Sequence, residues 1–428
     1  MKSSRRLTVI LLVSLASSVA RAAGNEFYLK GGETIVFFGD SITQGGTYVE
    51  YVEAYLATRF PDKTFRVINR GISSETISGT SEADHQPRRP NAHDRFTRDI
   101  ASCKPDIVVA CFGMNDGNYF PFEPVRFAKF QAGINQLIER TRDEAKARIV
   151  LMTPPPFDPY RRKAGDPRAT EFGYKFPAMD YDNTLAHYGE WELTLRDRGI
   201  VVADVHTAMS EHLRRRRAET VSFALQNDAV HPEATGHWLM AQTLLEAWNA
   251  PAVCAEARID ASDLRAETGE VTHLRRDGTA LRWSWKSPLP MPMDSRWDTT
   301  SIALEKVADR LNRYRLAATR LPAGRYRLIA DGKAIATVSR AELENGLNLL
   351  DYPAFPTIAL SREVLALIQE RSRMLYATWR KSIAPPKSAD PQGGVGDSVE
   401  TERQAAEVAA KMRELCRPRN IQIELVPL

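Results

Sequence analysis

The feature that most constrains the fold of this chain is a repeated alternation of short apolar runs with helical patterns. The predicted strands are residues 34–38, 65–68, 106–112, 148–152 and 200–205, and the predicted helices are residues 49–59, 124–142, 182–197 and 233–248. Continuous apolar runs indicate strands that are buried on both faces, as in parallel sheets. Strands that alternate with helices imply right-handed crossovers. Residues 30–250 are therefore predicted to form one α/β domain with about five parallel strands between two layers of helices.

Two stretches interrupt this alternation, residues 74–95 and 154–180. Both are rich in Pro, Asp, Arg, Gly and aromatic residues, and both follow the ends of predicted strands. Open α/β sheets bind their ligands beyond the carboxyl ends of the strands. We therefore expect these two loops to shape the pocket.

The remainder of the chain, residues 258–428, predicts a smaller α+β region. Asp277-Gly278 and Asp331-Gly332 each stand between apolar-alternating runs, which is typical of hairpins. Further patterns predict helices at residues 300–318, 361–380 and 400–416, a last strand at 421–426 and a mobile segment at 384–397. No active-site motif is recognisable in this region.

The N-terminus has the pattern of a secretory signal peptide. Basic residues precede an apolar run over residues 7–15, and Ala20-Arg21-Ala22 fits a cleavage site. The alternative is a membrane anchor, but the apolar run is shorter than the roughly 20 residues that span a bilayer. Residues 1–22 are therefore predicted to be removed on export to the periplasm or the extracellular space.

Charge argues against a nucleic-acid partner. Four of the 58 basic residues and none of the 54 acidic ones lie in residues 1–22, so the mature chain is formally neutral. A neutral balance lacks the electrostatic attraction that polyanions require. The run of arginines at residues 214–217 is interpreted as the solvated end of a helix.

The four cysteines leave the disulfide pattern open. In an oxidising compartment Cys103, Cys111, Cys254 and Cys416 allow three pairings. Cys111 lies inside an apolar run and is expected to be a buried thiol. A Cys254–Cys416 bridge is one candidate. The spacing of the four matches no zinc pattern.

Ser41 is the candidate nucleophile. Gly39-Asp40-Ser41 directly follows the first predicted strand and opens into a helix, where backbone N–H groups can stabilise an oxyanion. The alternative is an ordinary helix-capping serine. Gly396-Asp397-Ser398 repeats the tripeptide without a preceding strand and is interpreted as a chance occurrence.

Asp228 and His231 are the candidate partners of that serine. A serine nucleophile needs a base, and the base needs a group that orients it. The segment Asp228-Ala229-Val230-His231-Pro232 precedes the last predicted helix of the domain and supplies both groups. The three-residue separation lets the carboxylate reach Nδ1 of the imidazole, so that Nε2 can face Ser41.

Gly71 and Asn115 are candidate oxyanion donors. Asn115 follows the third predicted strand and can present its side-chain amide, while Gly71 follows the second and can bring a backbone N–H close. Taken singly, a turn glycine and a capping asparagine would also explain them.

Together these blocks resemble the SGNH hydrolase family, also called GDSL esterases and lipases, over about residues 34–248. Ser41, Gly71, Asn115 and His231 occur in the family's order, with Asp228 three residues before the histidine. The resemblance implies a flavodoxin-like three-layer sandwich and a mechanism without metal or other cofactor. It also implies an oxyanion hole made by the N–H groups of Ser41 and Gly71 and the side chain of Asn115. The Gly-x-Ser-x-Gly elbow of α/β-hydrolases is absent from the chain.

The sequence favours an esterase that removes small acyl groups, acetyl above all, from carbohydrate esters. Export, a neutral mature chain and aromatic loop residues suited to sugars favour this interpretation; the aromatic residues are Tyr119, Phe120, Phe157, Tyr160, Phe172 and Tyr174. The expected partner is a small-molecule or polysaccharide ester, with no nucleic acid and no stable membrane span. One alternative is a lipase, lysophospholipase or thioesterase for longer acyl chains. Another is a non-catalytic carbohydrate-binding scaffold.

Overall fold

The computed structural model describes residues 26–383 and 396–428. The expected signal peptide, and residues 384–395 of the segment expected to be mobile, lie outside these ranges. No helix within the described ranges is long and apolar enough to span a bilayer.

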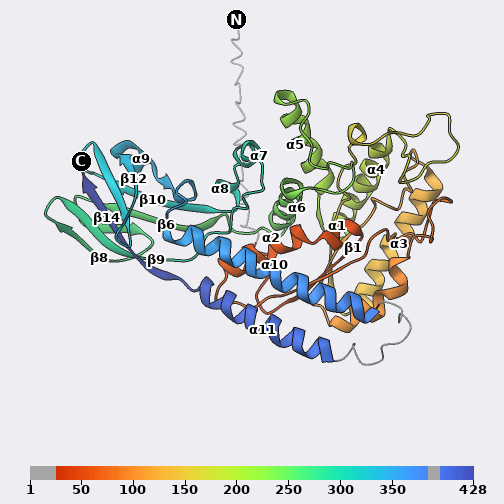
Figure 1. The fold of residues 1–428 in the computed structure, drawn as a ribbon, viewed down its shortest axis with the longest axis horizontal. Coiled ribbons are helices and arrows are strands. Elements are labelled where there is room, and N and C mark those ends of the chain that lie inside the picture. Colours follow the sequence, from red (N-terminus) through yellow and green to blue (C-terminus); the bar gives the residue numbers. More distant parts are fainter. Residues whose placement is uncertain (1–25, 384–395) are drawn as a thin grey trace, which may run out of the picture.

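A five-stranded parallel sheet in the order β2-β1-β3-β4-β5 forms the centre of the N-terminal part (Figure 1). Its strands are β1 Thr34–Gly39, β2 Arg66–Gly71, β3 Ile107–Cys111, β4 Arg148–Met152 and β5 Val201–Ala203. Its helices are α1 Ser41–Gly45, α2 Thr47–Arg59, α3 Pro124–Asp143, α4 Tyr181–Thr194, α5 Val205–Glu219 and α6 Ala234–Ala247. This strand order is that of flavodoxin-like sheets. The predicted α/β fold is confirmed.

The central strands are buried on both faces, which explains their continuous apolar sequences. Ile35 and Phe37 of β1 face a core formed with α2, α5 and α6, whereas Val36 and Phe38 face a core formed with α3. Side chains of successive strand residues point to opposite faces, so every position of the strand meets a helical layer.

The C-terminal part contains two further sheets around a core of its own. One sheet has the order β13-β10-β6-β7 and the other β12-β11-β14-β9-β8. The strands are β6 Val253–Asp260, β7 Arg265–Thr268, β8 Glu270–Asp277, β9 Ala280–Ser287, β10 Arg313–Thr319, β11 Arg325–Ala330, β12 Lys333–Ser339, β13 Leu347–Asn348 and β14 Arg419–Pro427. Large aromatic side chains, Trp283, Trp285, Tyr314 and Tyr326 among them, fill the space that the sheets enclose.

Both predicted hairpins are present as β8–β9 and β11–β12, but the helix expected at residues 300–318 is wrong. The segment holds two short helices, α7 Thr299–Leu304 and α8 Val307–Arg310, and then strand β10. Strand β10 pairs in parallel with β6, a partner about 60 residues earlier in the chain. Pairing at that separation is not visible in a local pattern. The expected start of the C-terminal region at residue 258 falls inside β6.

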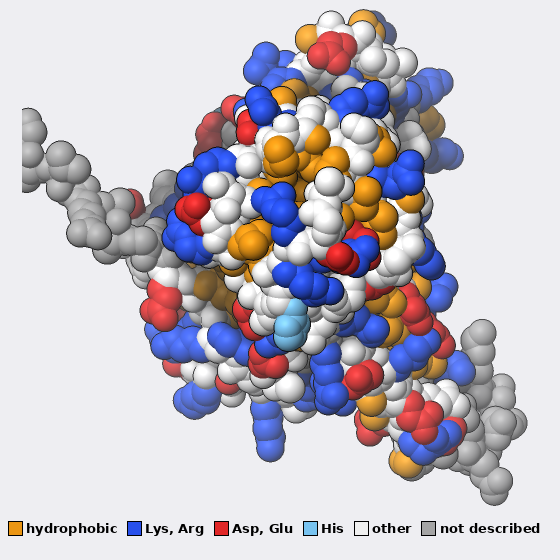
Figure 2. Space-filling view, turned by 90° about the vertical axis from the view of Figure 1, so that its left-hand side faces the viewer, with side chains coloured by type: hydrophobic (Ala, Val, Ile, Leu, Met, Phe, Trp, Pro, Cys, Tyr) orange, Lys and Arg blue, Asp and Glu red, His pale blue; other side chains and the backbone are white. Residues whose placement is uncertain are grey.

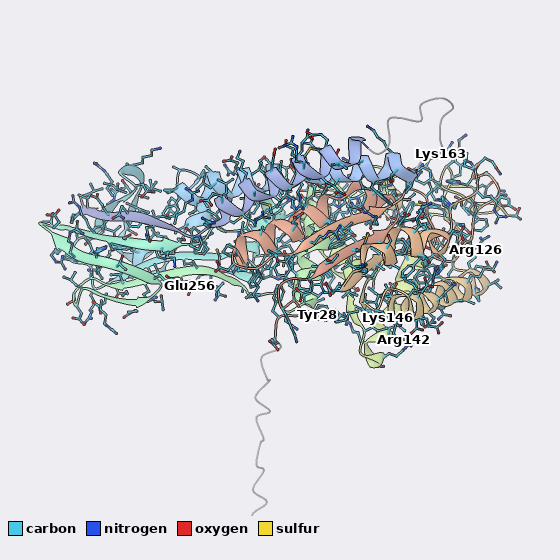
Figure 3. All side chains as sticks on the ribbon, turned by 90° about the horizontal axis from the view of Figure 1, so that it is seen from below. Tyr28, Arg126, Arg142, Lys146, Lys163 and Glu256 are labelled. Carbon is cyan, nitrogen blue, oxygen red and sulfur yellow. The ribbon has the colours of Figure 1, made fainter. Side chains whose placement is uncertain are left out.

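The C-terminal helices return to the α/β part. They are α9 Arg340–Asn345, α10 Pro356–Ile383 and α11 Gly396–Cys416. Figures 1 and 3 show α10 running from the β-rich end along the α/β part, with α11 beside it. Val364 and Ile368 of α10 and Met412 of α11 join the same core as α2.

The far end of the β-rich part presents apolar side chains surrounded by Lys and Arg (Figure 2).

The arginine run and the cysteines differ from expectation. Residues 214–217 do lie near the end of α5, but Arg216 is buried and pairs with Asp298 at 3.3 Å. All four cysteines are free, so the candidate Cys254–Cys416 bridge is absent.

Candidate active site

Ser41 is the first residue of α1, immediately beyond the end of β1. Asp40 caps this helix by accepting a hydrogen bond from the N–H of Ile42 at 3.0 Å. The turn is tight, because a Cβ on Gly39 would lie 2.6 Å from the carbonyl oxygen of Cys111. The N–H of Ser41 belongs to the first turn of α1, where N–H groups have no partner within the helix. The sharp strand-to-helix turn therefore places the hydroxyl and its own N–H at the carboxyl edge of the sheet.

The turn Asp228–His231 brings the imidazole to Ser41. Oδ1 of Asp228 accepts hydrogen bonds from the N–H groups of Val230 at 3.0 Å and His231 at 2.8 Å. Oδ2 lies 2.6 Å from Nδ1 of His231, and Nε2 of His231 lies 2.8 Å from Oγ of Ser41. Buried Ala229 has φ +78, a conformation that non-glycine residues rarely adopt. The three sequence-predicted residues thus form one continuous hydrogen-bond chain.

Hydrogen bonding sets the protonation states of Asp228 and His231. Burial favours a higher pKa for Asp228, but the hydrogen bonds from the ring and backbone of His231 and from Val230 outweigh it and hold the pKa far below its usual range. The hydrogen bond with Asp228 raises the pKa of His231, burial opposes the rise, and the charge of Asp228 adds to it. Asp228 is consequently ionised throughout the neutral range, and it stabilises the imidazolium that forms when His231 takes a proton.

Asn115 follows β3 and points its amide group toward the helix start. Its Nδ2 donates to the carbonyl of Glu75 at 3.1 Å and lies 3.4 Å from Oδ2 of Asp40, the residue before Ser41. Its Oδ1 accepts hydrogen bonds from Arg89 at 2.9 Å and from Tyr119 at 3.3 Å. With the oxygen held by two donors, the amide N–H₂ is directed toward Glu75 and Asp40, the residue before Ser41.

Gly71 ends β2 and supports α1 directly. A Cβ at this position would lie 2.2 Å from the backbone nitrogen of Gln44 and 2.5 Å from the carbonyl carbon of Thr43. The N–H of Gly71 donates to Oδ1 of Asn69 at 2.8 Å, and the amide of Asn69 donates to the carbonyl of Thr43 at 2.6 Å. Only glycine permits this approach of strand and helix, and its N–H is engaged within the strand end.

Arg89 and Glu82 belong to the site and were not anticipated. Arg89 is buried and forms two hydrogen bonds of 2.5 Å with the carboxylate of Glu82, while its other terminal nitrogen holds Asn115. Both residues come from the 74–95 loop, which the sequence placed at the pocket without identifying them. No spacing rule distinguishes a buried loop arginine from the exposed ones around it.

Replacement of Arg89 by methionine is expected to lower kcat roughly tenfold with little change in KM. A charge-assisted hydrogen bond is worth about 1.5–3 kcal/mol, and its loss frees the amide of Asn115 to rotate. The substitution is combined with Glu82→Gln in a double variant, so that no unpaired carboxylate stays buried. Arg216→Met removes another buried, ion-paired arginine away from the site and serves as the control. An undiminished kcat in the Arg89 variant would contradict the role.

The aromatic residues expected to stack on sugars are divided by the fold. Tyr119 and Phe157 are buried, with exposed fractions of 1% and 2%, so they have no face to offer and that expectation is wrong for them. Tyr160 is 77% exposed. Arg162 lies 3.7 Å from the ring centre of Tyr174 and donates to the carbonyl of Asp228 at 3.3 Å. The 154–180 loop therefore places Tyr174 and Arg162 beside the turn that carries His231.

Comparisons with known proteins agree with this architecture. The model of the GDSL-like lipase/acylhydrolase family matches residues 37–239. A curated acetylxylan esterase from Geobacillus stearothermophilus is 27% identical over 241 residues, which are 50% of this chain and 93% of that protein.

One solved structure extends the comparison to the C-terminal part. A gut microbial diltiazem-metabolizing enzyme covers 94% of this chain and 98% of its own, with a TM-score of 0.77 and 22% identity, so the two share a fold through nearly their whole lengths. The crystal structure of Axe2, an acetylxylan esterase from Geobacillus stearothermophilus, covers 52% of this chain and 96% of its own, with a TM-score of 0.38 and 26% identity. Through residues 37–239, the chain belongs to the GDSL-like lipase/acylhydrolase family and is a carboxylic ester hydrolase.

Proposed function

We propose that this protein is an exported serine esterase that removes acetyl groups from carbohydrate esters. The observation that carries the proposal is the hydrogen-bond chain from Asp228 through His231 to Ser41, with links of 2.6 and 2.8 Å. The acetylxylan esterase relative supports a carbohydrate acetyl ester as the substrate.

In the proposed mechanism His231 accepts the proton of Ser41 as its Oγ attacks the ester carbonyl. Asp228 holds the ring by Nδ1 and stabilises its charged form. The oxyanion is bound by the N–H of Ser41 and by the amide of Asn115, which exchanges its 3.4 Å contact with Asp40 for the oxyanion. The N–H of Gly71 contributes by sharing its hydrogen between Asn69 and the oxyanion. His231 then protonates the leaving alcohol, and water repeats the cycle on the acetyl-enzyme.

The acyl preference is tested with p-nitrophenyl acetate, butyrate and octanoate and with acetylated xylan, using the full chain. Rates are expected to fall as the acyl chain lengthens, and acetate is expected to be released from the polymer. Octanoate cleaved as fast as acetate would replace the proposal by a lipase, lysophospholipase or thioesterase. Turnover of the simple esters without any release from acetylated carbohydrates would contradict the substrate class alone.

Export is tested separately by expression in a secreting host and sequencing of the mature N-terminus. The proposal expects the protein outside the cytoplasm, beginning at residue 23, as the cleavage pattern predicts. An uncleaved N-terminus in the cytoplasm would contradict this part of the proposal and would leave the esterase chemistry untouched.

As the pH is lowered, kcat/KM is expected to fall with an apparent pKa above about 6.5. The base must be neutral to accept a proton, and an ordinary histidine has a pKa of about 6.5. Because the pKa of His231 is raised, its neutral form is lost at a higher pH as the solution is acidified. The charge of Arg162 lowers this pKa, so Arg162→Gln is expected to move the apparent pKa further upward. An apparent pKa below about 6 in the wild type would contradict the assignment.

A further inference from the structure

The C-terminal helix α10 contacts the strand end that supports the nucleophile. The hydroxyl of Tyr376 donates a hydrogen bond of 2.7 Å to the carbonyl oxygen of Gly71, across 305 residues of sequence. Five residues earlier in α10, Arg371 forms an ion pair with Glu53 of α2, and both side chains are largely buried. This helix therefore docks along α2 and reaches the carboxyl end of β2.

Both peptide groups around Gly71 are held from outside the strand. The carbonyl of the following peptide accepts from Tyr376. The carbonyl of the preceding peptide, that of Arg70, accepts from Arg95 at 2.7 Å, and Arg95 is fixed by two hydrogen bonds of 2.5 Å to Glu75. The preceding peptide also carries the N–H of Gly71. Rotation of either plane would break one of these bonds.

Trp379, one turn beyond Tyr376, packs on the guanidinium groups of Arg70 and Arg95. Its ring lies 4.5 Å from the guanidinium carbon of Arg70 and 5.8 Å from that of Arg95, and it contacts Tyr376 edge-on at 5.4 Å between ring centres. Cation–π contacts of this kind hold an arginine in place beside a ring. Trp379 thus contacts both side chains that fix the peptides around Gly71, namely Arg95 and Tyr376.

The strand end needs such support because its glycine is intrinsically free. Glycine has the widest range of backbone angles of all residues, so a terminal strand glycine does not fix its own peptide planes. The segment 69–71 also determines where α1 lies, since the amide of Asn69 holds the carbonyl of Thr43 and Gly71 contacts Gln44. Motion at Gly71 would therefore be transmitted to the helix whose first residue is Ser41.

We propose that Tyr376 is a positioning residue of the esterase site and that α10 is a structural component of this site. This rests on the proposed function of Ser41. The C-terminal part acts here by ordering the backbone that carries the nucleophile, in addition to any role in binding a polymer. Tyr376 touches no reacting atom in this scheme; it acts through Gly71.

The test compares Tyr376→Phe with Tyr55→Phe. The matched control also removes a tyrosine hydroxyl that donates to a backbone carbonyl, that of Pro251 at 2.7 Å, without contact to the strand end. Tyr376→Phe is expected to lower kcat and the rate of labelling by a fluorophosphonate together, roughly fivefold to tenfold, with KM within about twofold. Tyr55→Phe is expected to leave these three quantities unchanged.

Hydrogen–deuterium exchange of the peptide containing residues 69–71 supplies a readout independent of activity. Exchange there is expected to accelerate in Tyr376→Phe by more than in peptides remote from α10, and to stay at the wild-type rate in Tyr55→Phe. A Tyr376→Phe protein with wild-type kcat, labelling and exchange would overturn the inference. Activity that persists in Ser41→Ala would instead overturn the proposed function. The exchange rates at residues 69–71 do not depend on that outcome, so the two failures can be distinguished.

Discussion

Replacement of Ser41 by alanine is expected to reduce kcat for ester hydrolysis at least about 10⁴-fold and to abolish labelling by fluorophosphonates. The alanine cannot form the acyl-enzyme, so only substrate binding and the oxyanion donors would remain. Stability is expected to change little, because Ser41 is only partly buried and α1 keeps its Asp40 cap. The measurements are kcat and KM on p-nitrophenyl acetate, mass spectrometry of the labelled protein, and a thermal melt.

The chain contains its own control for this experiment. Ser398 closes the second Gly-Asp-Ser sequence, at the start of α11. Ser398→Ala is expected to retain wild-type turnover and labelling, since no predicted strand or base accompanies that copy. Wild-type turnover in Ser41→Ala, with loss of turnover in Ser398→Ala, would show that the nucleophile is Ser398 and would contradict the assignment of Ser41.

Replacement of Gly71 by alanine is expected to cost roughly 3 kcal/mol of unfolding free energy and most of the activity. The new Cβ would stand 2.2 Å from the nitrogen of Gln44, a backbone atom that cannot turn aside. Strand and helix would have to separate, and overpacking of this kind typically costs 1–3 kcal/mol or somewhat more. Because α1 carries Ser41, the displacement would also lengthen the bond to His231, with a roughly hundredfold loss of kcat/KM.

Gly324→Ala is the matched control for Gly71→Ala. No atom lies within 4 Å of a Cβ built on Gly324, and its φ is not in the left-handed region. Urea unfolding is expected to show a change within about 0.5 kcal/mol for this variant, as for ordinary surface substitutions. If Gly71→Ala proved as stable and as active as Gly324→Ala, the close contact between β2 and α1 would not determine the position of Ser41.

The sequence predicted the α/β half well because its signals are local. A buried parallel strand is a continuous apolar run, and the carboxyl ends of such strands meet at one edge of the sheet. Ser41 and Asn115 follow a strand and Gly71 ends one, and the structure brings all three to that edge. For Gly71 the structure supplies a further reason for a glycine, the contact with α1, which no pattern within β2 displays.

The sequence predicted the C-terminal half less well because its contacts are distant. In residues 313–319 the alternation of arginines and apolar residues is brief and follows two helical turns without an intervening Gly or Pro, so the whole stretch resembled one helix. Its strand state depends on pairing with β6. Arg89 and Tyr376 were missed for the same reason: each is a single polar residue whose partner is fixed only by the tertiary fold.

The position of α10 and α11 has a consequence for anyone who wishes to shorten this protein. Strand β2 is the outermost strand of the central sheet, and these two helices lie over its open side. A minimal esterase cut after residue 250 would leave an unprotected strand edge and the apolar flank of α2 in water, the usual template for intermolecular strand pairing. The smallest stable enzyme is therefore expected to need the two helices from its distant end, so that a working truncation would be a rejoined chain rather than a shorter one.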